Sequence, residues 1–220
     1  MSVDLRLYAL VDPEHAGGRE LVELARLVAH GGATLVQLRD KRSQTRLMVE
    51  RARAIKAALA PFNVPLLIND RVDVALASGA DGVHIGQDDM AVEDARRLLG
   101  RDAIIGLSIK SVAQAEAAAI DLLDYVGIGG VFATSSKDNT RPPIGTGGLT
   151  RIADIFRRRA PTFPLCGIAG IDATNAASTI AAGADGVAVI SALSLTRDPQ
   201  AAARELRAIV DAALAQRGRR

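Results

Sequence analysis

Short apolar runs alternate along the whole chain with longer alanine-rich stretches. Each run is bounded by Gly, Pro, Asn or Asp, which is typical of strands that end in turns. Several runs are apolar on successive residues, as expected for strands buried on both faces. The stretches between them have helical periodicity, for example over residues 20–29 and 202–214. The runs span residues 5–11, 34–38, 65–68, 82–85, 103–107, 124–128, 163–168 and 186–190.

This alternation predicts a parallel sheet, because parallel strands need long crossover connections that are usually helical. Dividing 220 residues among eight strand–helix units gives about 27 residues per unit, which suits a compact (β/α)8 TIM barrel. The alternative is an open doubly wound sheet, which normally has fewer strands. We therefore expect residues 1–220 to form a single α/β barrel domain, with residues 214–220 as a frayed basic tail.

A short internal repeat supports the barrel. The sequence Gly-Ala-Asp-Gly-Val occurs at residues 79–83 and again at 183–187, before the fourth and eighth predicted strands. A related Gly-Gly-Ala at residues 31–33 precedes the second strand. Glycine commonly ends a helix in the left-handed conformation. We interpret all three segments as helix-to-strand turns and assign them no chemistry.

Composition and charge narrow the class of protein. The chain is 49% hydrophobic and 24% charged, which excludes a largely disordered protein. A single cysteine excludes an internal disulfide, and the sequence has neither a secretory signal nor an apolar run long enough for a membrane helix. We expect a cytoplasmic protein with no membrane partner. A net charge of +2 with few aromatic residues also argues against nucleic-acid binding, so we interpret the spare arginines as solvated helix ends.

Candidate chemistry gathers after the predicted strands, where the active sites of such barrels lie. Gln37, Arg39 and Lys41 alternate at the end of the second strand and so share one side of it. Two cations and an amide suit a phosphate or diphosphate group. The alternative interpretation is a salt bridge at the strand end involving Asp40.

Acidic residues follow the next two strands. Asp70 comes directly after Asn69 at the end of the third strand, and Asp88 and Asp89 follow the fourth. Adjacent strands are about 4.8 Å apart, so Asp70 and one of the pair are placed to share Mg²⁺, which prefers carboxylate, phosphate and water oxygens. The alternative is that these residues cap helices. The chemistry alone does not choose between Asp88 and Asp89.

The later strands end in groups that suit anions. Ser108, after the fifth strand, is either a helix cap or a phosphate donor, and residues 134–137 (Thr-Ser-Ser-Lys) in the loop 129–148 are either a second anion clamp or a solvated loop. Residues 167–170 (Gly-Ile-Ala-Gly) and 190–191 (Ile-Ser) end the last two strands, where barrels of this kind bind phosphate through backbone N–H groups. The residues thus predict an enzyme with two anion sites and a Mg²⁺ site.

The histidines and the cysteine are weaker candidates. We expect His15 and His30 to be surface residues, and His84, inside the fourth strand, to be a core histidine with its hydrogen bonds satisfied. Cys166 is expected to be a small core residue.

Taken in order and at barrel spacing, these segments resemble the thiamine phosphate synthase family. The matching segments are residues 37–41, 69–70, 81–89, 106–108, 124–127, 134–137, 167–171 and 186–191. The resemblance implies that 4-amino-2-methyl-5-(diphosphooxymethyl)pyrimidine and 4-methyl-5-(2-phosphoethyl)thiazole are joined to give thiamine phosphate and pyrophosphate. It further implies a transferase that needs Mg²⁺ and reacts by dissociative substitution.

The resemblance also implies roles for individual residues. The pyrimidine diphosphate would be held by Gln37, Arg39, Lys41, Asn69, Ser108 and Lys137. The thiazole phosphate would be held by Thr134, Ser136, Gly170, Ile190 and Ser191. Mg²⁺ would be ligated by Asp70 and Asp89, and the groups expected to act in catalysis are Arg39, Lys41, Ser108 and Lys137.

Two departures and two alternatives accompany the resemblance. Ala169 stands where the family usually has glycine, and alanine disfavours a positive φ. Ser136 replaces the usual Thr but keeps the hydroxyl. The alternatives are a paralogous barrel that isomerises the thiazole phosphate, which lacks the metal carboxylates, and a non-catalytic regulatory barrel that binds phosphate. The sequence leaves open whether the chain forms a homo-oligomer.

Overall fold

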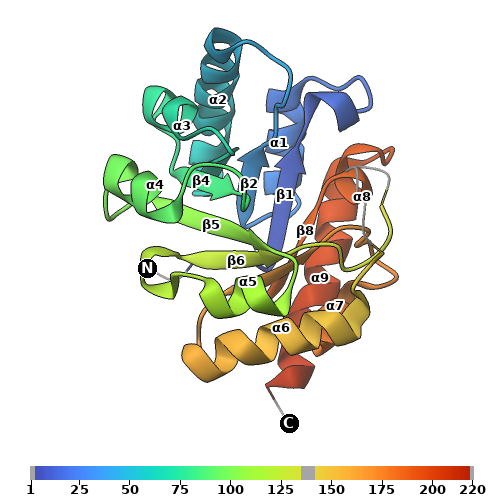
Figure 1. Cartoon of the computed structure of the whole chain (residues 1–220). Helices are drawn as coiled ribbons and strands as arrows, with labels where there is room; N and C mark the ends of the chain where they lie inside the picture. The colour runs from blue at the N-terminus through green and yellow to red at the C-terminus, as the bar shows by residue number, and fades with distance from the viewer. Residues whose placement is uncertain (1–2, 135–141, 219–220) are drawn as a thin grey trace.

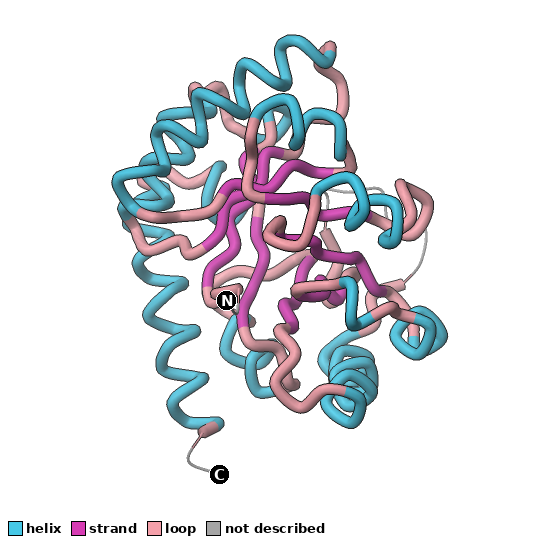
Figure 2. Tube along the Cα trace, turned by 90° about the vertical axis from the view of Figure 1, so that its left-hand side faces the viewer, coloured by secondary structure: helices cyan, strands magenta, loops and turns pink. Residues whose placement is uncertain are grey.

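The computed structural model describes residues 3–134 and 142–218, which form a closed barrel of eight parallel strands. The strands follow one another around the barrel in chain order, and β8 pairs with β1 to close it. Figures 1 and 2 show the strands at the centre with the helices arranged around them. The predicted TIM barrel is confirmed.

Each apolar run of the sequence overlaps one strand. The strands are β1 (Leu7–Val11), β2 (Leu35–Leu38), β3 (Leu66–Asn69), β4 (Gly82–Ile85), β5 (Ile104–Ile109), β6 (Tyr125–Ile128), β7 (Leu165–Ile168) and β8 (Gly186–Val189). The helices are α1 (Leu21–His30), α2 (Thr45–Leu59), α3 (Val72–Ser78), α4 (Val92–Leu99), α5 (Val112–Ala117), α6 (Gly145–Arg159), α7 (Ala176–Ala181), α8 (Ser191–Ser194) and α9 (Pro199–Arg217). Short 3₁₀ helices lie at η1 (Pro13–His15), η2 (Ala60–Phe62) and η3 (Ile120–Leu122).

Strand β5 is longer than the sequence predicts. Its pairing with β6 continues through Ser108, opposite Gly127, and Ile109, opposite Ile128. Ser108 therefore lies inside a strand and does not cap a helix. The helix cap is Ser111, whose hydroxyl accepts a hydrogen bond from the backbone N–H of Gln114 at 3.2 Å.

The alternation of side chains along the strands builds two hydrophobic cores. One lies between the strands and the surrounding helices, and the other fills the barrel interior. The interior core includes Tyr8, Leu35, Leu67, Tyr125 and Cys166, so Cys166 is buried as expected. Gly106 makes room for one of these rings, because a Cβ at that position would lie 2.1 Å from the ring of Tyr125.

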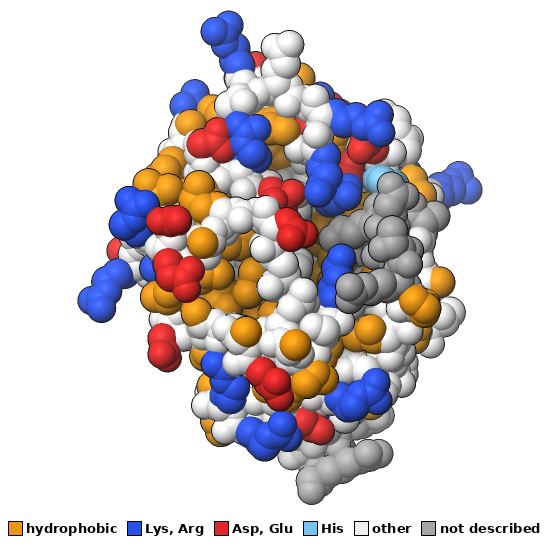
Figure 3. Space-filling model, viewed as in Figure 1, with side chains coloured by type: hydrophobic (Ala, Val, Ile, Leu, Met, Phe, Trp, Pro, Cys, Tyr) orange, Lys and Arg blue, Asp and Glu red, His pale blue; other side chains and the backbone are white. Residues whose placement is uncertain are grey.

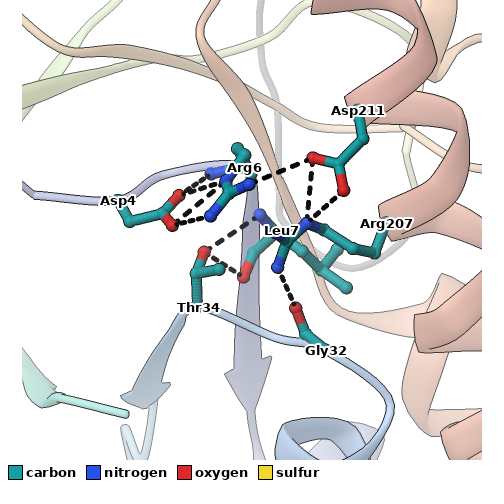
Figure 4. Close-up of polar contacts among 7 residues, drawn as sticks. All are labelled: Asp4, Arg6, Leu7, Gly32, Thr34, Arg207 and Asp211. Carbon is teal, nitrogen blue, oxygen red and sulfur yellow. Dashed lines mark hydrogen bonds and ion pairs between the residues drawn. The ribbon is translucent and has the colours of Figure 1, made fainter. Parts of the chain in front are cut away.

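At the N-terminal end of the barrel, polar side chains that precede the even-numbered strands form hydrogen bonds with the backbone of neighbouring strands. Thr34, just before β2, accepts a hydrogen bond from the backbone N–H of Leu7 at 3.1 Å and donates one to the Leu7 carbonyl at 3.2 Å. Figure 4 shows this contact beside Arg6, which pairs with Asp4 and with Asp211 of α9. The first strand is thereby tied to its neighbour and to the last helix.

Three aspartates make equivalent contacts just before the other even-numbered strands. Asp81, Asp124 and Asp185 accept hydrogen bonds from the first backbone N–H of β3, the second of β5 and the first of β7, at 2.8, 2.8 and 3.0 Å. Each also pairs with a basic side chain from a preceding helix. The repeated Gly-Ala-Asp-Gly turns are therefore structural, as expected. The aspartate in each turn is the residue that binds the neighbouring strand.

Several arginines that we expected to be solvated are also structural. Arg157 pairs with Asp185 at 2.6 Å, and Arg159 donates to the Ala115 carbonyl at 2.6 Å. Helix α9 continues to Arg217, which pairs with the same Asp185 at 2.7 Å. The expected frayed tail is therefore wrong for residues 214–217, because this contact holds the last turn of the helix against the barrel.

The charges on the outside of the molecule are mixed. On the face shown in Figure 3, basic and acidic side chains are interspersed, and no broad area carries one sign. Among the described residues, no helix is both long enough and apolar enough to cross a membrane.

Candidate active site

The end of β2 brings Gln37 and Arg39 into the barrel mouth. Both side chains follow the inward alternation of the strand, and the two residues are only 1% and 7% exposed. Lys41 lies further out on the rim, where its side chain is half-exposed and its ammonium group lies 3.2 Å from Asp70. The alternative of a salt bridge with Asp40 does not involve Arg39, because Asp40 pairs with Arg51.

The mouth holds buried polar atoms that have no hydrogen-bond partner. Among the described residues, these atoms are Gln37 Oε1, Arg39 Nε, Asn69 Nδ2 and His15 Nδ1. Buried polar groups are nearly always paired, and an unpaired one costs about 1–3 kcal/mol. Three of the four belong to residues at the ends of β2 and β3, so a polar ligand in this part of the barrel would find buried groups to pair with.

Two carboxylates face each other beside these groups. Asp89 accepts a hydrogen bond from the backbone N–H of Gly86 at 2.7 Å, and Asp70 has a positive φ of 62°. Burial raises the pKa of Asp70; the Lys41 charge opposes this rise, and the neighbouring Asp89 carboxyl adds to it. Neither aspartate is a helix cap, since α3 and α4 are preceded by Arg71 and Ala91.

The donor set at these carboxylates fits a divalent cation. Carboxylate oxygens held close together are hard ligands, and a cation between them would relieve the repulsion that raises the pKa of Asp70. No group of three or more His, Cys, Asp or Glu side chains in the described part of the chain could hold a metal ion. Two carboxylates completed by water and phosphate oxygens are what Mg²⁺ normally uses.

A chain of buried side chains crosses the barrel below the mouth. Gln37 donates through Nε2 to the Tyr8 hydroxyl, which lies 2.9 Å from the Tyr125 hydroxyl. The Tyr125 hydroxyl is 2.8 Å from His84 Nδ1, and His84 Nε2 is 2.9 Å from Ser108 Oγ. Burial raises the pKa of both tyrosines, so both phenols keep their protons at neutral pH. The chain links Gln37 of β2 to Ser108 of β5.

A small cavity of about 30 Å³ lies between the loops that follow β6, β7 and β8. Its lining includes Thr134, Gly170, Ile190 and Ser191, all of which were predicted to bind a phosphate. Gly170 has a φ of 64°, and a Cβ there would lie 2.2 Å from the Ala133 carbonyl oxygen. Only glycine lets the loop after β7 approach the loop after β6 so closely.

Comparison with known proteins decides what this site belongs to. The family described as "Thiamine monophosphate synthase" matches residues 7–193. The chain belongs to the thiamine monophosphate synthase family. It is 52% identical over 215 residues to a thiamine-phosphate synthase from Agrobacterium fabrum, with 98% of each chain covered. It is 47% identical to another from Albidiferax ferrireducens, which covers 94% of this chain and 93% of that protein.

A solved structure agrees with these relatives. The chain is similar to a thiamine phosphate pyrophosphorylase from Pyrococcus furiosus, with a TM-score of 0.84 and 35% sequence identity over 96% of this chain and 98% of that one. The predicted family, the activity of a thiamine-phosphate synthase and the enzyme class, a transferase, are confirmed.

Two residues that the family resemblance assigns to the substrates, Ser136 and Lys137, lie outside the described residues. The long loop expected over residues 129–148 is also shorter than predicted, because helix α6 already begins at Gly145. The expectation counted the glycines of that first turn as loop. A helix tolerates them there because the preceding Ile144 carbonyl accepts the backbone N–H of Gly148 at 3.0 Å.

The departure at Ala169 is a real strain in this family member. Ala169 has a φ of 92°, in the left-handed region that disfavours side chains. The loop is nevertheless held in place, because the backbone N–H of Phe132 donates to the Ala169 carbonyl at 3.0 Å. The loop after β7 thus has a positive φ at residue 169 despite the methyl group of the alanine.

Residue-by-residue reasoning missed four side chains around the site: Tyr8, Tyr125, Asp12 and His15. His84 has both ring nitrogens in hydrogen bonds, as expected of a core histidine, but one of its partners is Ser108. His15 was expected on the surface, yet its Nδ1 is buried. A signal for the rings was present in the glycines at interior positions of β5 and β6, which leave space for aromatic side chains.

Proposed function

We propose that this chain joins 4-amino-2-methyl-5-(diphosphooxymethyl)pyrimidine to 4-methyl-5-(2-phosphoethyl)thiazole at the barrel mouth and requires Mg²⁺ to do so. The observation that carries the proposal is the set of unpartnered buried atoms of Gln37, Arg39 and Asn69, which lie at the ends of adjacent strands. A ligand carrying an amino-substituted ring and a diphosphate would supply partners for an acceptor and two donors.

The pyrimidine diphosphate is expected to occupy the β2–β5 side of the mouth. Gln37 Oε1 is an acceptor suited to the amino group of the ring, because its amide nitrogen is already engaged with Tyr8. Arg39, Lys41, Ser108 and Lys137 would bind the diphosphate oxygens. Asp70 and Asp89 would hold Mg²⁺, which when bound supplies positive charge next to the diphosphate.

The reaction would proceed by loss of pyrophosphate before the new bond forms. The C–O bond to the diphosphate breaks, its electron pair leaves with pyrophosphate, and the pyrimidine ring stabilises the methylene cation that remains. The thiazole nitrogen then attacks this carbon. The side chains contribute by positioning both substrates and by stabilising the charge on the leaving group; no protein nucleophile is needed.

The phosphate group of the thiazole substrate is expected at the small cavity between the last three loops. Thr134, Gly170 and Ser191 line it together with Ile190, and Ser136 would add a second hydroxyl. This arrangement gives each phosphorylated substrate its own anion site. The mouth and the cavity share the same end of the barrel, as the reaction requires.

The test measures pyrophosphate release from purified protein with both substrates, each alone, and with Mg²⁺ replaced by EDTA. Release should need both substrates and Mg²⁺, and Lys137→Ala should lower turnover by about 100-fold, as the loss of a preorganised charge contact does. Isomerisation of the thiazole phosphate without pyrophosphate release would favour the paralogous barrel. Binding of both phosphates without turnover would favour a regulatory barrel, and near-normal turnover of Lys137→Ala would refute the role of that residue.

The proposal also covers the domain organisation of the protein and its location in the cell. We propose that residues 1–220 act as one domain in the cytoplasm. The closed barrel that spans β1 to β8 supports a single folding unit, and the single buried cysteine is compatible with a reducing compartment.

A further inference from the structure

Asp12 is a buried carboxylate beside the proposed diphosphate site to which the proposed reaction gives no role. It follows β1 directly and is 1% exposed. One oxygen, Oδ1, accepts the backbone N–H of Glu14 at 2.8 Å. The other, Oδ2, accepts a hydrogen bond from Arg39 Nη1 and lies 3.3 Å from His15 Nδ1. Both carboxylate oxygens are therefore engaged.

Arg39 is the charged side chain with which this carboxylate pairs. Its side chain is 8% exposed, so a guanidinium without a partner would be an uncompensated buried charge. A guanidinium carries five N–H donors in a rigid plane. Fixing Nη1 on Asp12 therefore fixes the direction of the remaining donors, including Nε, which is buried and has no partner among the described residues.

Asp12 compensates the buried positive charge of Arg39, although by itself it would repel a diphosphate. Beyond this compensation, the hydrogen bond to Nη1 fixes the orientation of the guanidinium. A second ion pair, between Glu14 Oε1 and Arg42 Nε at 2.6 Å, joins the same two loops at the surface.

We propose that Asp12 is a positioning residue that holds the Arg39 guanidinium in the orientation that binds the diphosphate of the pyrimidine substrate. The proposal rests on the proposed function of the mouth. It assigns to the loop after β1 a part in binding the diphosphate substrate without touching that substrate.

The first test compares Asp12→Asn with the parent protein in steady-state kinetics with Mg²⁺. The amide keeps the size of the side chain, but it cannot offer two acceptors to Glu14 and Arg39. We expect KM for the pyrimidine diphosphate to rise about tenfold, the change that follows from losing one charge-assisted hydrogen bond. KM for the thiazole phosphate should stay within about twofold, and Asp12→Glu should restore part of the loss. Glu14→Gln, which breaks only the surface pair, is the matched control and should leave both values unchanged.

The second test asks whether Asp12 acts through Arg39. In an Arg39→Ala background, Asp12→Asn should have little further effect, because the group that it positions is gone. A further tenfold loss in that background, or an equal rise in KM for both substrates, would overturn the proposal. Calorimetric titration with inorganic pyrophosphate and Mg²⁺ gives a reading without turnover and should show about tenfold weaker binding to Asp12→Asn or, if that variant does not fold, weaker binding to Asp12→Glu.

These measurements separate the two proposals. If the parent protein releases no pyrophosphate, the proposed function fails, whereas unequal binding of inorganic pyrophosphate by the parent and Asp12→Asn still supports the positioning role. If the parent is active and Asp12→Asn matches it in KM and in pyrophosphate binding, only the positioning role fails.

Discussion

The strained alanine in the loop after β7 gives a prediction whose size follows from the structure. Ala169 has a φ of 92°, and an L-residue in the left-handed region costs about 1–2 kcal/mol relative to glycine. Ala169→Gly removes that strain. It also gives the unfolded chain more freedom, which costs about 0.5–1 kcal/mol. With the middle value of each range, the difference is a net gain in the free energy of unfolding of about 0.75 kcal/mol.

The rest of the loop gives no reason for a larger change. The Ala169 carbonyl accepts the backbone N–H of Phe132, and the preceding Ile168 carbonyl accepts that of Val131. Neither bond involves the Ala169 side chain. For a chain of this length, 1 kcal/mol shifts the melting temperature by about 2–4 °C. We therefore expect Ala169→Gly to melt about 1–4 °C higher, with KM for the thiazole phosphate within about twofold of the parent value.

The assay is differential scanning calorimetry, checked by urea unfolding, with Ala182→Gly as the matched control. Ala182 is the C-cap residue that follows α7 and has an ordinary φ of −76°. The same substitution there should therefore only add unfolded-state freedom and lower stability by about 0.5–1 kcal/mol. The reasoning is refuted if Ala169→Gly loses as much stability as Ala182→Gly. In that case the left-handed conformation at residue 169 would carry no strain.

Two further substitutions test the mouth itself. Asp70→Asn should raise the melting temperature of the metal-free protein at pH 7 by about 1–2 °C, because burial raises the pKa of Asp70 above its ordinary value and makes the ionised form unfavourable on folding. The penalty for burying ionised Asp70 appears only as pH rises through the raised pKa, so the gain in melting temperature should vanish below about pH 4. A gain that is larger at pH 4 than at pH 7 would contradict this prediction. Tyr125→Phe removes the hydroxyl between Tyr8 and His84 and should lower the free energy of unfolding by about 1–3 kcal/mol in urea titrations; unchanged stability would mean that the buried chain is not continuous.

The sequence was sufficient for those parts of the fold and site that depend on local periodicity. Gln37 and Arg39 point into the barrel because strand alternation puts them on one side, and this needed no structure. The eight strands were found for the same reason. The end of β5 was misplaced because its last residues are held by pairing with β6, and the end of α9 because Arg217 is anchored by a distant aspartate.

The supporting side chains could not be predicted because their partners are distant in sequence. Tyr8 and Tyr125 meet across 117 positions, and Asp12 meets Arg39 across 27. No spacing pattern marks such pairs, since the closure of the barrel alone brings them together. His15 shows the same limit: it lies in a short polar segment that reads as surface, yet it packs beside a carboxylate fixed by the next strand.

The polar groups at the two ends of the barrel differ in whether they have hydrogen-bond partners. At the N-terminal end, Asp81, Asp124 and Asp185 each bind both a backbone N–H and a basic side chain, so their hydrogen-bonding capacity serves stability. At the mouth, Gln37 and Asn69 keep buried atoms without partners at a cost of about 1–3 kcal/mol each. Because the polar groups at the N-terminal end are paired, the geometry of the barrel does not by itself prevent such pairing at the mouth. The unsatisfied atoms at the mouth are therefore best explained by a ligand that completes them.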